Sequence, residues 1–196
     1  MKKPEDRLFE LASGQQGFFT TKQALAAGYA ARVHSYHAGT GTWIRECRGI
    51  YRLARFPESP EAQYVLWSLW SRNRFEVPQG VFSYQTALSL HELSDINPAK
   101  LHLTVPVSFR RNAAPPVVLA LHHDDVPARD IERRQGFCLT RPLRTIVDLV
   151  LEEAESSDHL RQALQQALAR GLVTQAEIQR NPDRRRLEFL QKGGRS

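Results

Sequence analysis

The chain has 196 residues, of which 41% are hydrophobic and 24% are charged, a composition typical of a folded globular protein. Its net charge of +6 and isoelectric point near 9.7 favour a negatively charged partner. The N-terminus lacks the apolar run of a secretory signal, and no apolar window is long enough to span a membrane. Cys47 and Cys138 lie outside any CxxC pattern and indicate reduced thiols. We therefore expect a cytoplasmic protein with no membrane contact.

Three short helices are predicted within the first 40 residues. Pro4–Ala12 combines a proline and acidic residues in its first turn with an apolar face, a pattern typical of a helix. The threonine pair 20–21 stands where an N-cap belongs, before the helix-forming stretch Lys22–Ala27. Gly28 breaks the chain because glycine adopts turn conformations readily, and a second polar helix follows at Ala30–Ala38.

A two-stranded hairpin is predicted directly after these helices. Residues 43–46 and 50–53 alternate in the manner of strands and are joined by a turn at residues 47–49. We expect Trp43 and Tyr51 to pack the hairpin against the helices. Helix, turn, helix and basic hairpin together predict a winged helix-turn-helix, a module that presents its second helix and its wing to DNA.

The distribution of charge agrees with this interpretation. Residues 1–56 carry nine Lys or Arg and four Asp or Glu, a net +5, whereas residues 57–180 have a net charge of −2 and residues 181–196 one of +3. Basic side chains on the second helix and the wing are those expected to contact phosphates and bases. The candidate DNA-binding residues are Lys22, Arg32, Ser35, Tyr36, His37, Arg45, Arg48 and Arg52. Any one of these arginines could instead be a solvated surface residue that does not contact DNA. For His34 and His37 we expect surface positions rather than a metal site.

The remainder of the chain predicts a second domain of mixed secondary structure. Two prolines between residues 57 and 60 mark a boundary, so the expected domains are residues 1–56, 57–180 and a basic, fraying tail at 181–196. Helices are expected at 61–72, 84–92, 158–170, from 141 and from 174, and strands at 101–106, 117–122 and 136–140. The fold class is therefore α+β, a winged helix-turn-helix followed by helices around a small sheet.

Motifs for catalysis are absent from the sequence, which has no glycine-rich phosphate loop, GxSxG or HExxH. The segment 122–125, HHDD, is either a metal-binding cluster or, as we prefer, an exposed polar turn. Asp148, beside Arg141 and Arg144, is either a structural salt link or a catalytic carboxylate. We expect no enzyme, cofactor or metal. A nuclease or phosphotransfer enzyme remains the alternative if Asp124, Asp125 and Asp148 converge, and a protein-binding adaptor that has lost DNA binding is a third hypothesis.

Two stretches, FTTKQALAAGY and WIRECRGIYRL, resemble the N-terminal domain of AbiEi-type antitoxins. In that family a Thr-capped helix, an A-G-Y/F turn and a G-x-W-x-R-x-x-R-G-x-Y-R-L wing recur. The stretches FSYQTALSLHEL and RPLRTIVDL are similar to the C-terminal domain of the same family. The resemblance extends over roughly residues 5–170, whereas the arginine-rich tail matches no family motif.

The resemblance implies a transcriptional repressor that binds repeats, expected to be inverted, in the operator of its own operon. It also implies the antitoxin of a type IV toxin–antitoxin system with a role in phage resistance. The toxin of such a system would resemble a nucleotidyltransferase, and it need not form a stable complex with the antitoxin. Similar N-terminal domains also occur in solitary regulators without a toxin gene, and fused to a repair-type nuclease domain whose acidic motif this chain lacks.

Overall fold

The computed structural model describes residues 2–95, 98–111 and 114–192, which divide into two compact units. The N-terminal unit contains the residues up to Gly80 together with Arg133–Cys138. The C-terminal unit contains Val81–Glu132 and the residues from Leu139 onward. Both units combine helices with a small sheet, so the predicted α+β class is confirmed.

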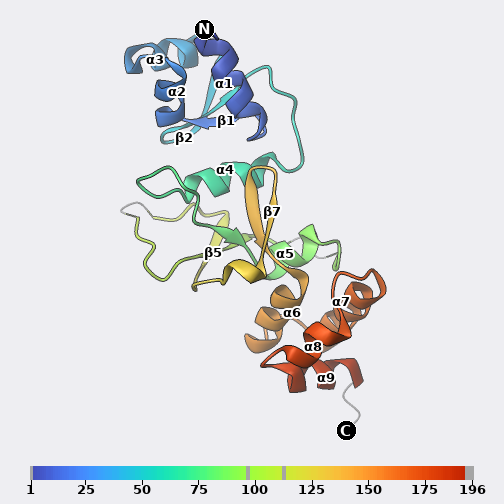
Figure 1. Cartoon of the computed structure of the whole chain (residues 1–196). Helices are drawn as coiled ribbons and strands as arrows, with labels where there is room; N and C mark the ends of the chain where they lie inside the picture. The colour runs from blue at the N-terminus through green and yellow to red at the C-terminus, as the bar shows by residue number, and fades with distance from the viewer. Residues whose placement is uncertain (1, 96–97, 112–113, 193–196) are drawn as a thin grey trace. The chain divides into compact units, whose positions relative to one another are not determined.

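The N-terminal unit has the helices and the hairpin expected from the sequence (Figure 1). Its elements in chain order are α1 (Pro4–Ser13), β1 (Phe18–Thr20), α2 (Thr21–Ala27), α3 (Ala31–Gly39), β2 (Trp43–Cys47), β3 (Ile50–Leu53) and α4 (Ala62–Trp70). The short strand β1 was not predicted, because a three-residue strand has no periodicity of its own. It completes a winged helix-turn-helix in which α2 and α3 form the helical pair and β2 and β3 the wing.

Local chemistry fixes both ends of α2. The Thr20 hydroxyl accepts a hydrogen bond from the Gln23 backbone N–H (3.2 Å), and the Gln23 side-chain oxygen accepts one from the Thr20 N–H (2.8 Å). Gly28 ends the helix at φ 105°, in the left-handed region that favours glycine. A Cβ at Gly28 would also lie 2.7 Å from Nη2 of Arg7. The turn between α2 and α3 therefore depends on this glycine.

The three strands form an antiparallel sheet in the order β1-β3-β2. Trp43 pairs with Leu53 and Arg45 with Tyr51, and a bulge follows between Arg45 and Cys47. One face of the sheet packs with α1, α2 and α3 (Figure 1). The buried core of this region consists of Leu8, Ala12, Phe19, Ala24, Ala27 and Trp43.

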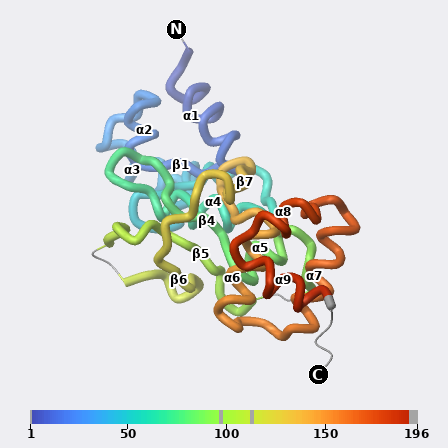
Figure 2. The backbone as a smooth tube through the Cα atoms, turned by 60° about the horizontal axis from the view of Figure 1, so that its bottom comes forward, coloured from blue at the N-terminus to red at the C-terminus, as the bar shows by residue number. Residues whose placement is uncertain are grey.

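A second sheet has the strand order β6-β5-β4-β8-β7, and the part of its β7–β8 hairpin at Arg133–Cys138 is counted with the N-terminal unit. Strand β4 pairs antiparallel with β5 and parallel with β8, and β5 pairs parallel with β6. The elements from residue 81 are β4 (Val81–Phe82), α5 (Tyr84–Leu90), β5 (Leu101–Val105), β6 (Leu119–His123), the 3-10 helix Ala128–Asp130, β7 (Ile131–Arg134), β8 (Phe137–Thr140), α6 (Pro142–Leu151), α7 (Ser157–Ala169), α8 (Gln175–Arg180) and α9 (Arg184–Lys192). Helices α6 to α9 gather towards the C-terminal end of the chain (Figures 1 and 2).

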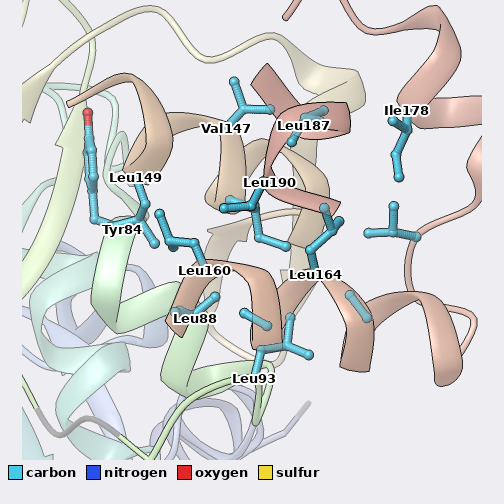
Figure 3. Close-up of a cluster of buried hydrophobic side chains, with 14 residues drawn as sticks. Tyr84, Leu88, Leu93, Val147, Leu149, Leu160, Leu164, Ile178, Leu187 and Leu190 are labelled. Carbon is cyan, nitrogen blue, oxygen red and sulfur yellow. The ribbon is translucent and has the colours of Figure 1, made fainter. Parts of the chain in front are cut away.

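Helix α9 is the main difference from the expected architecture of this unit. The sequence predicts a fraying basic tail, but Leu187 and Leu190 of α9 are buried in the same apolar cluster as Leu160 and Leu164 of α7 (Figure 3). The arginines at residues 184–186 are exposed and obscured this amphipathic pattern. Residues 193–196 of the expected tail lie outside the described part of the chain.

Helix α4 belongs to the N-terminal unit rather than to the unit that follows it. The rings of Tyr64 and Phe137 lie 5.4 Å apart, and Val65 lies beside Gly136, so α4 packs on the turn that joins β7 to β8. The compact unit is therefore longer than the expected 1–56 segment. None of the helices described is long and apolar enough to cross a membrane. Cys47 and Cys138 do not form a disulfide.

Candidate nucleic-acid interface

Helix α3 presents one continuous exposed face. Arg32, Ser35, Tyr36 and Gly39 are all exposed and follow the i, i+3, i+4, i+7 spacing of a single helical face. Tyr36 is 65% exposed although it is aromatic. The structure therefore brings three of the candidate residues, Arg32, Ser35 and Tyr36, onto the surface that a recognition helix turns towards DNA.

The opposite face of α3 is packed against the wing, and here the expectation for His34 is wrong. His34 is only 5% exposed, its Nε2 donates to the Tyr29 carbonyl oxygen (3.3 Å), and its ring lies 5.4 Å from that of Trp43. In the sequence, His34 and His37 are spaced like two surface residues of one helix. In the structure, His34 faces the aromatic core. His37 is half-buried, stacked on Trp43 with its Nδ1 3.0 Å from the Thr42 hydroxyl.

Two arginines of the wing are exposed. Successive side chains of a strand point to opposite faces of the sheet, so Arg45 lies on the same face as Trp43, two residues before it. This is the face of the sheet that packs with the helices. Arg48 lies in the turn of the wing, next to Gly49 at φ 77°. Within the described residues neither arginine is paired with an acid. The wing therefore offers two unneutralised guanidinium groups.

The two remaining cationic candidates are already paired. Arg52 lies opposite Ile44, on the face of the sheet that does not carry Trp43, and its Nε donates to Glu46 at 3.0 Å. Lys22, in the first turn of α2, donates to the Arg74 carbonyl oxygen at 2.9 Å and lies 3.5 Å from Glu76. These pairs reduce the positive charge that Arg52 and Lys22 present.

Glu76 is a residue at this surface that sequence reasoning missed. Its carboxylate accepts hydrogen bonds from the Thr20 hydroxyl (2.6 Å) and pairs with Arg72 Nε (3.2 Å) and Lys22. Arg72 in turn donates from Nη2 to the Gly49 carbonyl oxygen at 3.3 Å. Glu76 and Arg72 thus connect the start of α2 with the turn of the wing. A separation of 56 residues between Thr20 and Glu76 leaves no local sequence signal.

The acidic residues of the enzyme hypothesis are held by a salt-bridge network in the C-terminal unit. Arg144 donates to Asp148 at 2.7 Å and to Asp124 at 2.6 Å, while Asp125 accepts from the Val107 N–H at 3.2 Å. Burial raises the pKa of Asp148 to about 6, against the lowering effect of Arg144. Within the described residues, no three His, Cys, Asp or Glu side chains are grouped to hold a metal ion. This arrangement fits the structural salt link better than a catalytic carboxylate.

A second polar cluster in this unit joins α5, β5 and β6. The Tyr84 hydroxyl donates to Glu152 (2.6 Å), its ring stacks on His122 at 3.9 Å, and His122 Nε2 lies 2.9 Å from His102 Nδ1. Burial lowers the pKa of both histidines, and burial together with the hydrogen bond to Glu152 raises that of Tyr84. In Figure 3 the Tyr84 hydroxyl points away from the leucines of the core.

The fold and exposed face of the N-terminal unit define a winged helix-turn-helix module. Residues 6–54 match the profile of a family described as "Transcriptional regulator, AbiEi antitoxin", which confirms the resemblance over this region. The match ends directly after β3, inside the N-terminal unit, and leaves the C-terminal unit uncovered. The family is one of transcriptional regulators and antitoxins rather than a class of enzymes.

The whole chain also resembles a solved structure. The crystal structure of the RV2827C protein from Mycobacterium tuberculosis superimposes with a TM-score of 0.54 over 98% of this chain and 72% of that one, at 14% sequence identity. At this identity the likeness supports the fold alone. No curated protein matches the chain.

Proposed function

We propose that the protein is a DNA-binding transcriptional repressor that acts on the operator of its own operon. The observation that carries the proposal is the exposed face of α3, with Arg32, Ser35 and Tyr36, together with Arg45 and Arg48 of the wing, for which the described part of the chain supplies no acidic partner. A helix of this kind fits the major groove, and guanidinium groups on a wing contact phosphates or reach the minor groove. The match of residues 6–54 to a family of transcriptional regulators supports this function.

The test is binding of the full chain to the DNA upstream of its own gene. Retarded migration of this duplex, with weaker retardation of a scrambled duplex of equal length and composition, is the expected result. Because the operator is expected to contain inverted repeats, two protected half-sites should be seen in a footprint. Equal binding to both duplexes, or no binding at low salt, would contradict an operator-specific repressor.

We further propose that the C-terminal unit gives the protein the role of a type IV antitoxin. The profile that supports this role covers only residues 6–54, so the proposal rests on the resemblance of the C-terminal stretches. Co-expression of the full chain should restore the growth of cells that are inhibited by a nucleotidyltransferase-like protein from the neighbouring gene. The two proteins should elute separately in gel filtration. Failure of the full chain to restore growth would refute the antitoxin role and leave a solitary regulator, whereas restored growth with the C-terminal unit deleted would show that the C-terminal unit is not what counters the toxin.

A further inference from the structure

The loop at residues 72–77, between α4 and β4, is closed by its own hydrogen bonds. The side-chain oxygen of Asn73 accepts from the backbone N–H groups of Phe75 (2.8 Å) and Val77 (3.1 Å). The Asn73 N–H donates to the Val77 carbonyl at 2.9 Å, and that of Glu76 donates to the Asn73 carbonyl at 3.1 Å. Asn73 therefore holds this loop in one ordered turn.

The ordered loop is tied to two parts of the DNA-binding module, the start of α2 and the turn of the wing. Glu76 binds the Thr20 hydroxyl at the start of α2, and Arg72 binds the Gly49 carbonyl in the turn of the wing. The Arg74 carbonyl accepts a hydrogen bond from Lys22 in the first turn of α2. In a helix-turn-helix, the first helix crosses the DNA backbone while the second enters the major groove. The loop is thus hydrogen-bonded to both of the elements that the proposed DNA binding would bring close to phosphates.

Its tip carries an exposed cation and an exposed ring. Phe75 is 70% exposed, and the guanidinium carbon of Arg74 lies 4.7 Å from the centre of its ring. Stacking orients the guanidinium while its N–H groups stay available, and within the described residues Arg74 is not paired with an acid. An ordered, oriented arginine is suited to a phosphate oxygen.

We propose that the loop at residues 72–77 is a third DNA-contacting element, in which Arg74 binds a backbone phosphate beside the wing and Phe75 orients it. The proposal rests on the proposed DNA binding and adds to it an element outside the segment that matches the regulator family. Lys22 is hydrogen-bonded to the Arg74 carbonyl, and Arg48 directly precedes Gly49, whose carbonyl Arg72 binds, so the loop adds its arginine next to two candidate residues.

The experiment compares Arg74→Ala, Phe75→Ala and Arg129→Ala in the full chain by fluorescence anisotropy on the upstream duplex. Arg129 is an exposed arginine of the C-terminal unit and controls for the lost charge. Arg74→Ala should weaken binding about fivefold and reduce the slope of log K against log salt by about one. Phe75→Ala should weaken binding with little change of slope, and Arg129→Ala should bind like the wild type. Equal melting temperatures show that all variants are folded.

A hydroxyl-radical footprint locates the contact. Arg74→Ala should lose protection at one group of phosphates next to those protected by the wing, with the major-groove contacts kept. The inference is overturned if Arg74→Ala binds like the wild type, or like Arg129→Ala, while Arg32→Ala/Arg48→Ala weakens binding. If Arg32→Ala/Arg48→Ala also binds normally, the proposed DNA-binding function itself fails, and the third contact fails with it.

Discussion

The imidazole of His37 stacks on the indole of Trp43, with ring centroids 4.6 Å apart and planes 18° from parallel. Trp43 is the first residue of the wing and is 3% exposed, whereas His37 lies in the last turn of α3. This contact, and the His37–Thr42 hydrogen bond, fix the wing relative to the recognition helix. His37 therefore positions the interface more than it extends it.

Replacement of His37 separates this positioning role from direct contact. His37→Ala should lower the free energy of unfolding by about 1–2 kcal/mol, because it removes a stacked ring and a hydrogen bond. Tyr36→Ala is the matched control, since Tyr36 is the exposed neighbour, and should leave stability almost unchanged while weakening DNA binding. Thermal unfolding and duplex titration measure the two effects. Equal loss of stability in both variants would contradict the role of His37.

The turn between the two helices depends on Gly28. Gly28→Ala should lower the free energy of unfolding by about 1–2 kcal/mol, because a Cβ is strained at positive φ and would contact Arg7. Gly39→Ala offers a control, since a Cβ there meets nothing within 4 Å and φ is not positive. That variant should be neutral or slightly more stable. Chemical denaturation of both variants tests the prediction, and a neutral Gly28→Ala would contradict it.

Removal of the Glu76 charge should release Lys22 for DNA. Glu76→Gln keeps an acceptor for the Thr20 hydroxyl but loses the ion pairs, so affinity should rise about threefold and the salt slope steepen by up to about one. Glu46→Gln releases Arg52 in the same way, but Arg52 lies on the sheet face that does not carry Trp43. Glu46→Gln should therefore leave the affinity for DNA unchanged. If Glu46→Gln strengthens binding and Glu76→Gln does not, the assignment of these two cations is reversed.

The His102–His122 pair should make stability depend on pH. Burial lowers both pKa values below 6.5, so the unfolded histidines take up protons before the folded ones do. The contribution of the pair is complete above about pH 6.5 and is lost as the pH falls towards the folded pKa values. His102→Gln/His122→Gln should therefore destabilise the protein more at pH 7.5 than at pH 5. A difference that does not change between these two pH values would be inconsistent with neutral, paired histidines.

Much of the N-terminal unit could be predicted because its determinants are local. The threonine cap, Gly28 and the hairpin turn each act within a few residues, and the predicted α1, α2, α3 and wing follow from them. What was missed depends on distant partners. Strand β1 exists because Phe18 pairs opposite Arg52, and His34 is buried because Trp43 covers it. The amphipathic pattern of α9 was hidden by its three exposed arginines.

The candidate nucleic-acid interface also divides into features set by local sequence and features set by distant partners. Arg32, Ser35 and Tyr36 could be placed on one face from helical spacing alone. Glu76 and Arg72 could not, because their partners Thr20 and Gly49 are far away in the chain. Sequence reasoning assigns charge to a segment, but it cannot show which cations are already neutralised by acids brought in through folding.

The salt dependence of duplex binding by Arg32→Ala/Arg48→Ala tests the central claim most directly. Arg32 represents the exposed face of α3 and Arg48 the turn of the wing, while Lys100→Ala/Arg129→Ala removes two exposed cations from the C-terminal unit as a control. The predicted result is an affinity loss of at least about tenfold and a slope of log K against log salt smaller by about two, with the control unchanged. Affinity and slope equal to those of the wild type would contradict DNA recognition by this winged helix.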